Sequence, residues 1–335
     1  MTGPAPDPTR RLMPVVRLAP AKLNLTLAVI GRRPDGSHVL HSVFVPLALA
    51  DRLSLSPAAA GPDTLHVAGF DAGPVENNLV LRAIAATRFA VGGGWPGGPG
   101  PAPSLAVRLE KHIPVAAGLA GGSSDAAAAM DGALEAWGAE LVPDARHAIA
   151  ARLGSDVPFF LAGGPALVEG RGESVVPLLG LGAGPGVLLV TPAVPVATPE
   201  VFAMFDALGG RGSGSTRMSS AHLAEELRSG LSAADLVARA GALTVANDLL
   251  QAALVFVPEL VPFRRALSRL LARPIGLSGS GPTLWALYPS ESEATLAADA
   301  VRAAVRDGSL SVPGSAAPFV TATRILTGRH EEREP

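Results

Sequence analysis

The segment of residues 114–130, PVAAGLAGGSSDAAAAM, constrains the fold of this chain more than any other segment. Three glycines within five residues, Gly118, Gly121 and Gly122, lead into Ser-Ser-Asp and then into four consecutive alanines. Alanine has the highest helix propensity, and serine and aspartate are residues that start helices. The pattern therefore predicts a glycine-rich loop that ends at the N-terminus of a helix.

A loop of this kind can bind phosphate. The first turn of a helix has unpaired backbone N–H groups and the positive end of the helix dipole, and glycine lets a ligand oxygen approach the backbone closely. A glycine turn before a core helix is the alternative, because 38 of the 335 residues are glycine. The loop is not a Walker A motif, since no Lys-Ser or Lys-Thr follows its glycines, and its glycine spacing differs from that of dinucleotide-binding motifs.

Length and composition limit the classes of function. A chain of 335 residues is long enough for two domains. Its 48% hydrophobic content and net charge of −2 argue against a disordered chain or a protein that coats nucleic acid. The absence of cysteine excludes disulfides, thiolate metal sites and a cysteine nucleophile. Prolines and charges interrupt every long apolar stretch, so we expect a soluble cytoplasmic protein with no membrane span.

Lysine is rare in this chain. Lys22 and Lys111 are the two lysines among 27 basic residues. An ammonium is a compact point charge that a planar guanidinium does not replace. A chemical role at these two positions would therefore explain why lysine is present there rather than arginine. The alternative is that these two lysines are present by chance in a chain whose other basic residues are arginine. This alternative remains open for Lys111.

Hydrophobic periodicity and turn residues predict a mixed α and β chain. We expect strands at 15–18, 23–30, 38–49, 52–56, 65–67, 105–109, 186–191, 284–288 and 319–326. We expect helices at 79–90, after the glycine loop, and at 144–153, 200–208, 221–228, 232–241, 248–256, 259–272 and 291–306. Loops are expected at 92–103 and 211–220, and a second glycine turn at 276–280.

Two further residues stand in short motifs. Lys22 lies in PAKLN at the mouth of an apolar strand, where a solvated strand end is the alternative. Asp156 lies in GSDVPFF, where a turn or capping aspartate is the alternative. Each motif is weak alone, but PAKLN, the glycine loop, GSDVPFF and LSGSGPT (residues 277–283) follow one another in a single order.

This ordered set of motifs, from residue 15 to about 328, resembles the GHMP kinases, whose phosphate loop has the form P-x-x-x-G-L-x-x-[GS]-[GS]. More narrowly, it resembles the branch that acts on 4-diphosphocytidyl-2-C-methyl-D-erythritol in the non-mevalonate isoprenoid pathway. The resemblance implies an α+β, two-domain GHMP kinase fold. Its N-terminal domain is ribosomal protein S5 domain 2-like and is expected at 15–178. Its C-terminal domain is ferredoxin-like and is expected at 179–328, with tails at 1–14 (disordered) and 329–335.

The resemblance also implies an activity and its residues. The expected reaction is ATP-dependent phosphorylation of the substrate's 2-hydroxyl, with Asp156 as general base and Lys22 holding the hydroxyl and offsetting developing charge. Positions that match nucleotide-binding residues are Asn78, Leu79, Lys111, Pro114, Gly118, Leu119, Ala120, Gly121, Gly122, Ser123 and Ser124. Positions that match substrate-binding residues are Asn24, His38, Thr198, Phe202, Gly279 and Ser280. Mg²⁺ is expected to arrive with ATP, without a dedicated protein metal site, and no nucleic-acid or membrane partner is expected.

Two positions depart from the family pattern. Ala120 replaces a glycine common in the loop, which is tolerable if its φ is negative. Ser37 replaces the aromatic residue of Asp-Gly-aromatic-His, so we expect one face of the cytosine to be poorly covered while His38 hydrogen-bonds the base and Phe202 stacks on it.

Two alternatives remain. One is another GHMP kinase, of the homoserine or mevalonate type, which the PAKLN and DGSH contexts disfavour. The other is a non-catalytic nucleotide-binding relative. Lys22 and Asp156 together disfavour it, because a binding module has no use for an exposed base–ammonium pair.

Overall fold

The structure is a computed structural model, and it describes residues 14–58, 61–92, 95–96, 100–179, 181 and 184–328. The chain forms two compact units. The first contains the residues up to Ala19, Ala50–Val115 and Gly121–Leu161, and the second contains Pro20–Leu49, Ala116–Ala120 and the residues from Ala162 onward. Because the units interleave along the sequence, the domain limits expected near residue 178 stay a prediction. The expected tails lie outside the described residues, apart from Pro14.

Two strands, β1 (Val15–Asn24) and β3 (His38–Pro57), contribute residues to both units. The first unit also contains β4 (Thr64–Gly69), the 3-10 turn η1 (Val75–Asn77), α1 (Leu79–Val91), β5 (Leu105–Lys111), α2 (Gly121–Trp137), α3 (Pro143–Leu153) and α4 (Val157–Ala162). The second unit contains β2 (Ala28–Arg32), β6 (Ala166–Gly170), β7 (Ser174–Pro177), β8 (Gly186–Thr191), α5 (Thr198–Ala207), α6 (Gly214–Arg228), α7 (Ala233–Ala238), α8 (Ala240–Leu243), α9 (Leu250–Phe256), α10 (Leu260–Leu271), β9 (Gly276–Leu277), β10 (Leu284–Tyr288), α11 (Glu291–Arg306) and β11 (Phe319–Arg324).

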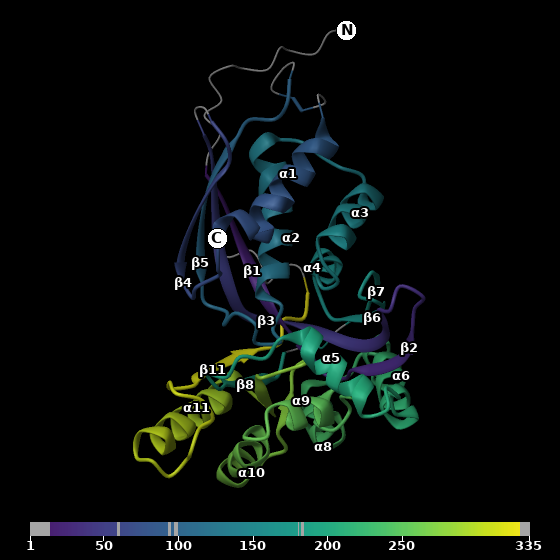
Figure 1. The fold of residues 1–335 in the computed structure, drawn as a ribbon, viewed down its shortest axis with the longest axis vertical. Helices are drawn as coiled ribbons and strands as arrows, with labels where there is room; N and C mark the ends of the chain where they lie inside the picture. Colours follow the sequence, from purple (N-terminus) through teal and green to yellow (C-terminus); the bar gives the residue numbers. More distant parts are fainter. Residues whose placement is uncertain are drawn as a thin grey trace. The chain divides into compact units, whose positions relative to one another are not determined.

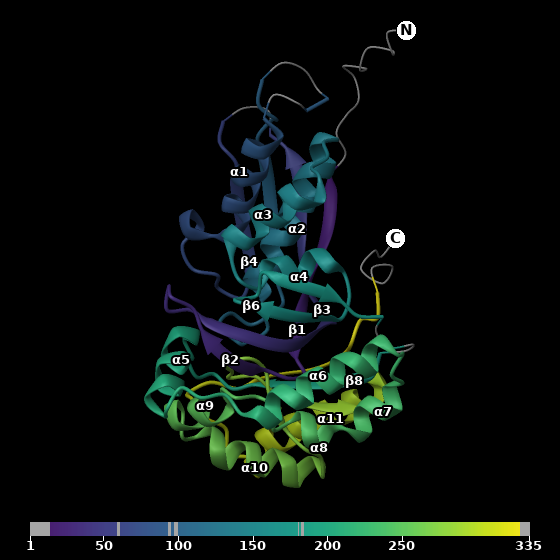
Figure 2. The same cartoon turned by 90° about the vertical axis from the view of Figure 1, so that its right-hand side faces the viewer.

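In the first unit, helices α1, α2 and α3 lie against one face of the strands (Figure 1, Figure 2). Strand β5 pairs antiparallel with the end of β3 and parallel with β4. The buried face of α2 contains many small residues, including Ala126, Ala129 and Ala133. A Cβ atom on Gly132 would lie 2.6 Å from the side chain of Leu55 on β3. Small residues therefore let α2 pack closely on the sheet.

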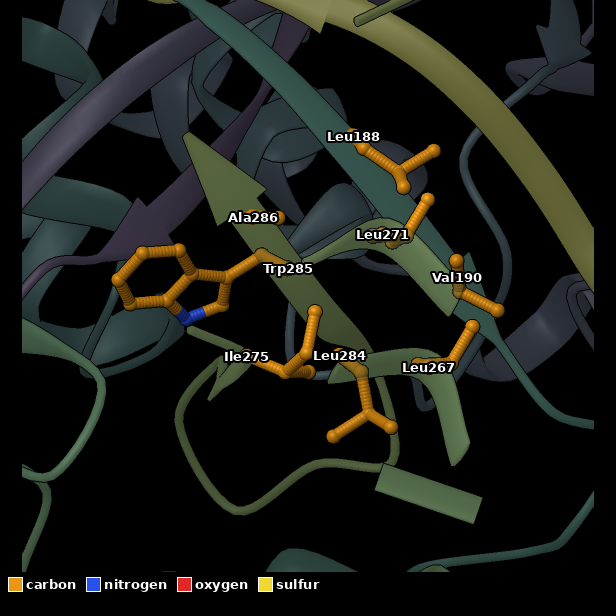
Figure 3. A pocket seen from close by; sticks show the side chains of 8 residues that line it. All are labelled: Leu188, Val190, Leu267, Leu271, Ile275, Leu284, Trp285 and Ala286. Atoms are coloured by element: carbon orange, nitrogen blue, oxygen red, sulfur yellow. The ribbon is translucent and has the colours of Figure 1, made fainter. Parts of the chain in front are cut away.

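In the second unit, four antiparallel strands form a sheet in the order β11-β8-β10-β9, with α9, α10 and α11 beside it (Figure 1). Leu267 and Leu271 of α10 line an apolar hollow with Val190 of β8 and Leu284 of β10, while the indole of Trp285 points away from them (Figure 3). Val190, Leu267 and Leu284 belong to the buried core of this unit, and Leu271 packs against that core. None of the helices in the described part of the chain is long and apolar enough to cross a membrane.

Most expected elements are present, and several of the differences come from pairing between strands that are distant in the sequence. Residues 19–22, expected as a link, belong to β1, which runs without a break from Val15 to Asn24 because it pairs with β3. Similarly, β3 is one strand of 20 residues where two were expected. Strands β6 and β7 were not predicted. Gly276 and Leu277 form a short strand rather than part of a turn, because they pair with β10.

Helices α2 and α6 begin earlier than expected. Helix α2 begins at Gly121, so Ser123, Ser124 and Asp125 lie inside it rather than before it. The loop expected at 211–220 is wrong, since α6 begins at Gly214. The Ser213 hydroxyl accepts a hydrogen bond from the Ser215 N–H and caps α6, a local preference that outweighs the glycine and serine composition.

The glycine loop has a left-handed backbone at two alanines. The φ angles of Ala116 and Ala120 are 53° and 55°, in the region that favours glycine. The condition for tolerating alanine at residue 120, a negative φ, is therefore not met. A left-handed alanine costs about 1–2 kcal/mol, so the surrounding contacts must hold this loop in place.

A buried cluster of three charged residues holds the start of α2 against β5 and β3. The Lys111 Nζ atom donates to Asp51 Oδ2 and to Asp125 Oδ2, the latter at 2.7 Å. Asp51 Oδ1 also accepts the backbone N–H groups of His112 and Ile113 at 2.5 and 2.8 Å. A Cβ atom on Gly121 would lie 3.1 Å from the Lys111 amine. The cluster therefore fixes the first turn of α2.

The electrostatics of this cluster depend on Asp125. Burial raises the pKa of Asp125 to about 8, although the Lys111 ammonium opposes the shift. An aspartate in an unfolded chain has a pKa near 3.9. Between these two values the folded protein binds more protons than the unfolded chain. Its free energy of unfolding therefore falls as the pH rises through this range.

We predict that Asp125→Asn removes this loss of stability. The free energy of unfolding of the variant, relative to that of the parent protein, should rise by at least about 1 kcal/mol between pH 5.5 and pH 8, because asparagine does not ionise. Urea unfolding at both pH values checks this. Asp131→Asn, a partly exposed position on the same helix, is the matched control. A stability difference that does not change with pH would show that Asp125 does not titrate in this range.

Candidate active site

Lys22 lies at the end of β1, and its charge is buried in the second unit, with 4% of the residue exposed. Its Nζ atom donates to Asn24 Oδ1 at 2.6 Å and to the Gly118 carbonyl at 2.9 Å, and it lies 5.0 Å from the centre of the Phe44 ring. The Lys22 backbone N–H donates to the Leu119 carbonyl at 3.0 Å. Lys22 is therefore held at one end of the glycine loop and is not a solvated strand end.

The turn between β9 and β10 holds the same part of the loop. Ser278 Oγ donates to the Gly118 carbonyl at 2.9 Å, and the Thr283 N–H donates to the Ala117 carbonyl at 3.4 Å. A Cβ atom on Gly118, whose φ is 77°, would lie 2.3 Å from the Ser278 carbonyl oxygen. Residue 118 must therefore be glycine, both because its φ is positive and because a side chain would collide with the Ser278 carbonyl oxygen.

The second glycine motif contacts the same lysine. A Cβ atom on Gly279 would lie 3.5 Å from Lys22 Nζ and 3.3 Å from Asn24 Oδ1. The Ser280 hydroxyl lies 2.9 Å from the Thr198 hydroxyl at the start of α5. The structure thus brings four predicted residues, Lys22, Asn24, Gly118 and Gly279, into one group, and it joins two more as a pair.

Sequence reasoning missed a buried asparagine that supports this group. Asn247 Nδ2 donates to the carbonyls of Leu277 and Gly279 at 3.1 and 2.9 Å. The Asn247 side chain thereby fixes the backbone of the turn. No motif surrounds Asn247 in the sequence, so its role follows from the fold alone.

A buried chain of polar side chains extends from Asn24 to helix α6. Asn24 Nδ2 donates to Ser42 Oγ at 3.2 Å, and Ser42 Oγ donates to the Thr26 carbonyl. Thr26 Oγ1 donates to Ser220 Oγ at 2.9 Å, and His41 Nδ1 lies 2.9 Å from the same oxygen. Burial lowers the pKa of His41. Sequence reasoning did not single out this network, because its hydroxyls lie in ordinary strand and helix patterns.

His38 lies at the start of β3, beside helix α5. Its ring is stacked on Phe202, with ring centres 4.7 Å apart and planes 22° apart. His38 Nε2 lies 2.8 Å from Asp206 Oδ1. The structure therefore brings together the two residues expected to hold the pyrimidine. Ser37 turns toward Asp35, whose Oδ1 accepts both the Ser37 N–H and the Ser37 hydroxyl.

The first unit carries Asp156 and the predicted nucleotide-binding residues other than Gly118, Leu119 and Ala120. Gly121, Gly122, Ser123 and Ser124 form the first turn of α2, where backbone N–H groups point out of the helix end. Ser124 Oγ is buried and has no hydrogen-bond partner among the described residues. Asp156 directly precedes α4, in a turn beside α2, since a Cβ atom on Gly154 would lie 3.9 Å from Ser123 Oγ.

Two predicted nucleotide-binding residues have structural contacts of their own. Asn78 caps α1, and its Oδ1 accepts the Val80 N–H at 3.0 Å, so Leu79 begins the helix. Lys111 is bound to two carboxylates in the buried cluster. Lys22 and Asp156 belong to different units, and their pairing stays a prediction. Among the described residues, no group of three or more histidines and carboxylates could hold a metal ion.

Family models match this chain in two places. The model of the GHMP kinases N terminal domain matches residues 78–164, and that of the GHMP kinases C terminal matches residues 226–307. The first match contains the glycine loop and Asp156, and the second contains the turn that follows β9.

Individual relatives are similar over most of their length. A protein of Pelotomaculum thermopropionicum named 4-diphosphocytidyl-2-C-methyl-D-erythritol kinase is 39% identical over 280 residues, 82% of this chain and 89% of that protein. A protein of Nocardia farcinica with the same name is 40% identical over 310 residues, 90% of this chain and 95% of that protein. A solved structure of 4-(cytidine 5'-diphospho)-2C-methyl-D-erythritol kinase is 32% identical, with a TM-score of 0.67, and the match covers 92% of this chain and 99% of that chain. The chain therefore belongs to the GHMP kinase family, and within it to the 4-diphosphocytidyl-2-C-methyl-D-erythritol kinases.

Proposed function

We propose that this chain transfers the terminal phosphoryl group of ATP to the 2-hydroxyl of 4-diphosphocytidyl-2-C-methyl-D-erythritol, giving the 2-phosphate and ADP. The observation that carries the proposal is the buried Lys22 ammonium bonded to the Gly118 carbonyl of the glycine loop. An ammonium tied to a phosphate-binding loop suits a reaction whose catalysis is mostly positioning and charge stabilisation.

Lys22 and Asp156 share the chemistry in this proposal. Asp156 accepts the proton of the substrate hydroxyl as the oxygen attacks the phosphoryl group. Lys22 orients that hydroxyl and stabilises the negative charge of the transferring group. Asn24 fixes the Lys22 ammonium on one side and belongs to the substrate side of the same group.

The first turn of α2 binds the ATP phosphates in this proposal, through its N–H groups and the helix dipole. Lys111 acts indirectly, because its amine is bound to Asp51 and Asp125 beneath Gly121. Mg²⁺ prefers oxygen ligands and is usually held by substrate phosphates with few protein ligands. Ser124 Oγ fits the role of a protein ligand to Mg²⁺, since it is a buried oxygen that forms no hydrogen bond with any described residue. Bound Mg²⁺ would neutralise phosphate charge.

His38 and Phe202 hold the cytosine in this proposal. A base that is hydrogen-bonded to the edge of His38 lies in the plane of the imidazole, which is within 22° of the Phe202 ring plane. Thr198, Gly279 and Ser280 complete the substrate side of the site. The names of the relatives favour this substrate over homoserine or mevalonate, and we place the reaction in the cytoplasm.

We predict that Asp156→Asn lowers kcat by about 10²–10⁴, because asparagine cannot accept the proton. Coupled ADP release with the diphosphocytidyl substrate measures kcat, and fluorescence titration with an ATP analogue confirms that nucleotide binding persists. Mevalonate and homoserine serve as comparison substrates. Turnover of either one without turnover of the diphosphocytidyl substrate would refute the proposed function, and a normal kcat would make Asp156 only a turn residue.

We predict that Lys22→Arg lowers kcat by at least about 10², because the planar guanidinium cannot keep both short bonds of the ammonium. Thermal unfolding of the variant separates this loss from misfolding. Arg52→Lys, at an exposed position on β3, is the control for exchanging the two cations. Near-normal turnover of Lys22→Arg would show that Lys22 has no catalytic role.

We predict that Ser37→Tyr lowers the KM for the cytidine substrate about fivefold or more and leaves the KM for ATP unchanged. Base–aromatic stacking contributes about 1–3 kcal/mol per base, and serine cannot supply that contact. Ser37→Ala is the control, because it removes the hydroxyl bond to Asp35 without adding a ring. An unchanged KM in Ser37→Tyr would mean that another side chain already covers that face of the base.

A further inference from the structure

Helix α5 holds the His38 ring from three sides. Phe202 stacks on the ring, Phe205 meets it edge-on with centres 5.9 Å apart, and Asp206 lies within hydrogen-bond distance of Nε2. Residues 202, 205 and 206 have the spacing of one helical face. Only 11% of the His38 side chain is exposed. The orientation of the imidazole is therefore set by the helix.

Asp206 also determines which nitrogen of His38 carries the proton. A carboxylate only accepts hydrogen bonds, so the neutral imidazole must place its proton on Nε2 to form the 2.8 Å contact. The other carboxylate oxygen lies 3.4 Å from Arg32 Nη1. Arg32 is the cross-strand partner of His38 in the β2–β3 pair.

The second ring nitrogen remains for a ligand. No described residue hydrogen-bonds to His38 Nδ1. With the proton on Nε2, Nδ1 is an acceptor. An acceptor at this position can accept a hydrogen bond from an amino group of a ligand. It cannot hydrogen-bond to a carbonyl oxygen, because both atoms are acceptors and neither carries a proton.

We propose that Asp206 is a positioning residue that determines pyrimidine specificity. By fixing the Nε2–H form of His38, it makes Nδ1 an acceptor for the 4-amino group of cytosine and a poor neighbour for the 4-oxygen of uracil. This inference rests on the proposed function, in which His38 contacts the base. Sites built around a hydrogen bond to a substrate group reject analogues that cannot make it, here by at least about tenfold.

The test is Asp206→Asn. The asparagine side chain can donate to Nε2, which moves the imidazole proton to Nδ1 and turns the acceptor into a donor. At pH 8, kcat/KM is measured for 4-diphosphocytidyl-2-C-methyl-D-erythritol and for its uridine counterpart. We expect the parent protein to prefer the cytidine substrate at least about tenfold and Asp206→Asn to lose most of that preference, while the KM for ATP is unchanged.

The ratio of the two substrates separates positioning from stability. A merely structural role of Asp206 would lower kcat/KM for both substrates equally, and an unchanged ratio would overturn the inference. Asp206→Glu keeps an accepting carboxylate and should keep the parent preference. Glu200→Gln, which removes an exposed charge from the first turn of α5, should change neither rate. If the parent protein phosphorylates neither pyrimidine substrate, the proposed function fails and this inference fails with it.

A second measurement applies if Asp206→Asn does not fold. Nitrogen-15 NMR of the histidine side chains in the parent protein at pH 8, with His38→Gln used to assign the signals, identifies the protonated nitrogen. The Nε2–H form is expected. Observation of the Nδ1–H form would overturn the inference.

Discussion

The Gly118 carbonyl oxygen accepts hydrogen bonds from two side chains that are far apart in the sequence, Lys22 Nζ and Ser278 Oγ, both at 2.9 Å. A bond to a charged donor is stronger than one between neutral groups, so this peptide group is a firm attachment for the loop. The same bonds fix the ammonium and the turn after β9. The position of the lysine and the shape of the glycine loop therefore depend on each other.

The sequence predicts well those features that depend on neighbouring residues. Helix α11 has the predicted bounds, 291–306, because its apolar residues have helical spacing and Ser290 caps its first turn. Prediction from the sequence fails where pairing between strands of a sheet determines where a strand begins and ends. Pro20 lies inside β1, which pairs with β3, and β3 continues through Ala50 and Asp51 to the residues that pair with β5. Glycine and serine between 211 and 220 suggested a loop, yet α6 has a capping serine and a buried face.

The candidate site also contains residues that the sequence predicts and residues that only the fold shows. Short motifs located Lys22, Gly118 and Gly279, and the fold places them within reach of one another. The residues that support them, such as Asn247 and Asp206, carry no local signal, since an asparagine or a helix aspartate usually caps, turns or faces water. Only the folded chain shows what these side chains hold. Lys111 shows the opposite case. The family resemblance implied a place near the nucleotide, but it did not show that two carboxylates bind the Lys111 amine.

Backbone strain in the glycine loop bears on the function proposed for it. Ala116 and Ala120 adopt left-handed conformations that alanine disfavours, and such residues persist only where the surroundings determine them. Donors to the carbonyls of Ala117, Gly118 and Leu119 come from β1 and from the turn after β9, and they hold the strained segment from both sides. A loop that is already ordered loses less conformational entropy when it binds phosphate. In the proposed function, the strain at these two alanines therefore belongs to a loop that already has its shape before ATP binds.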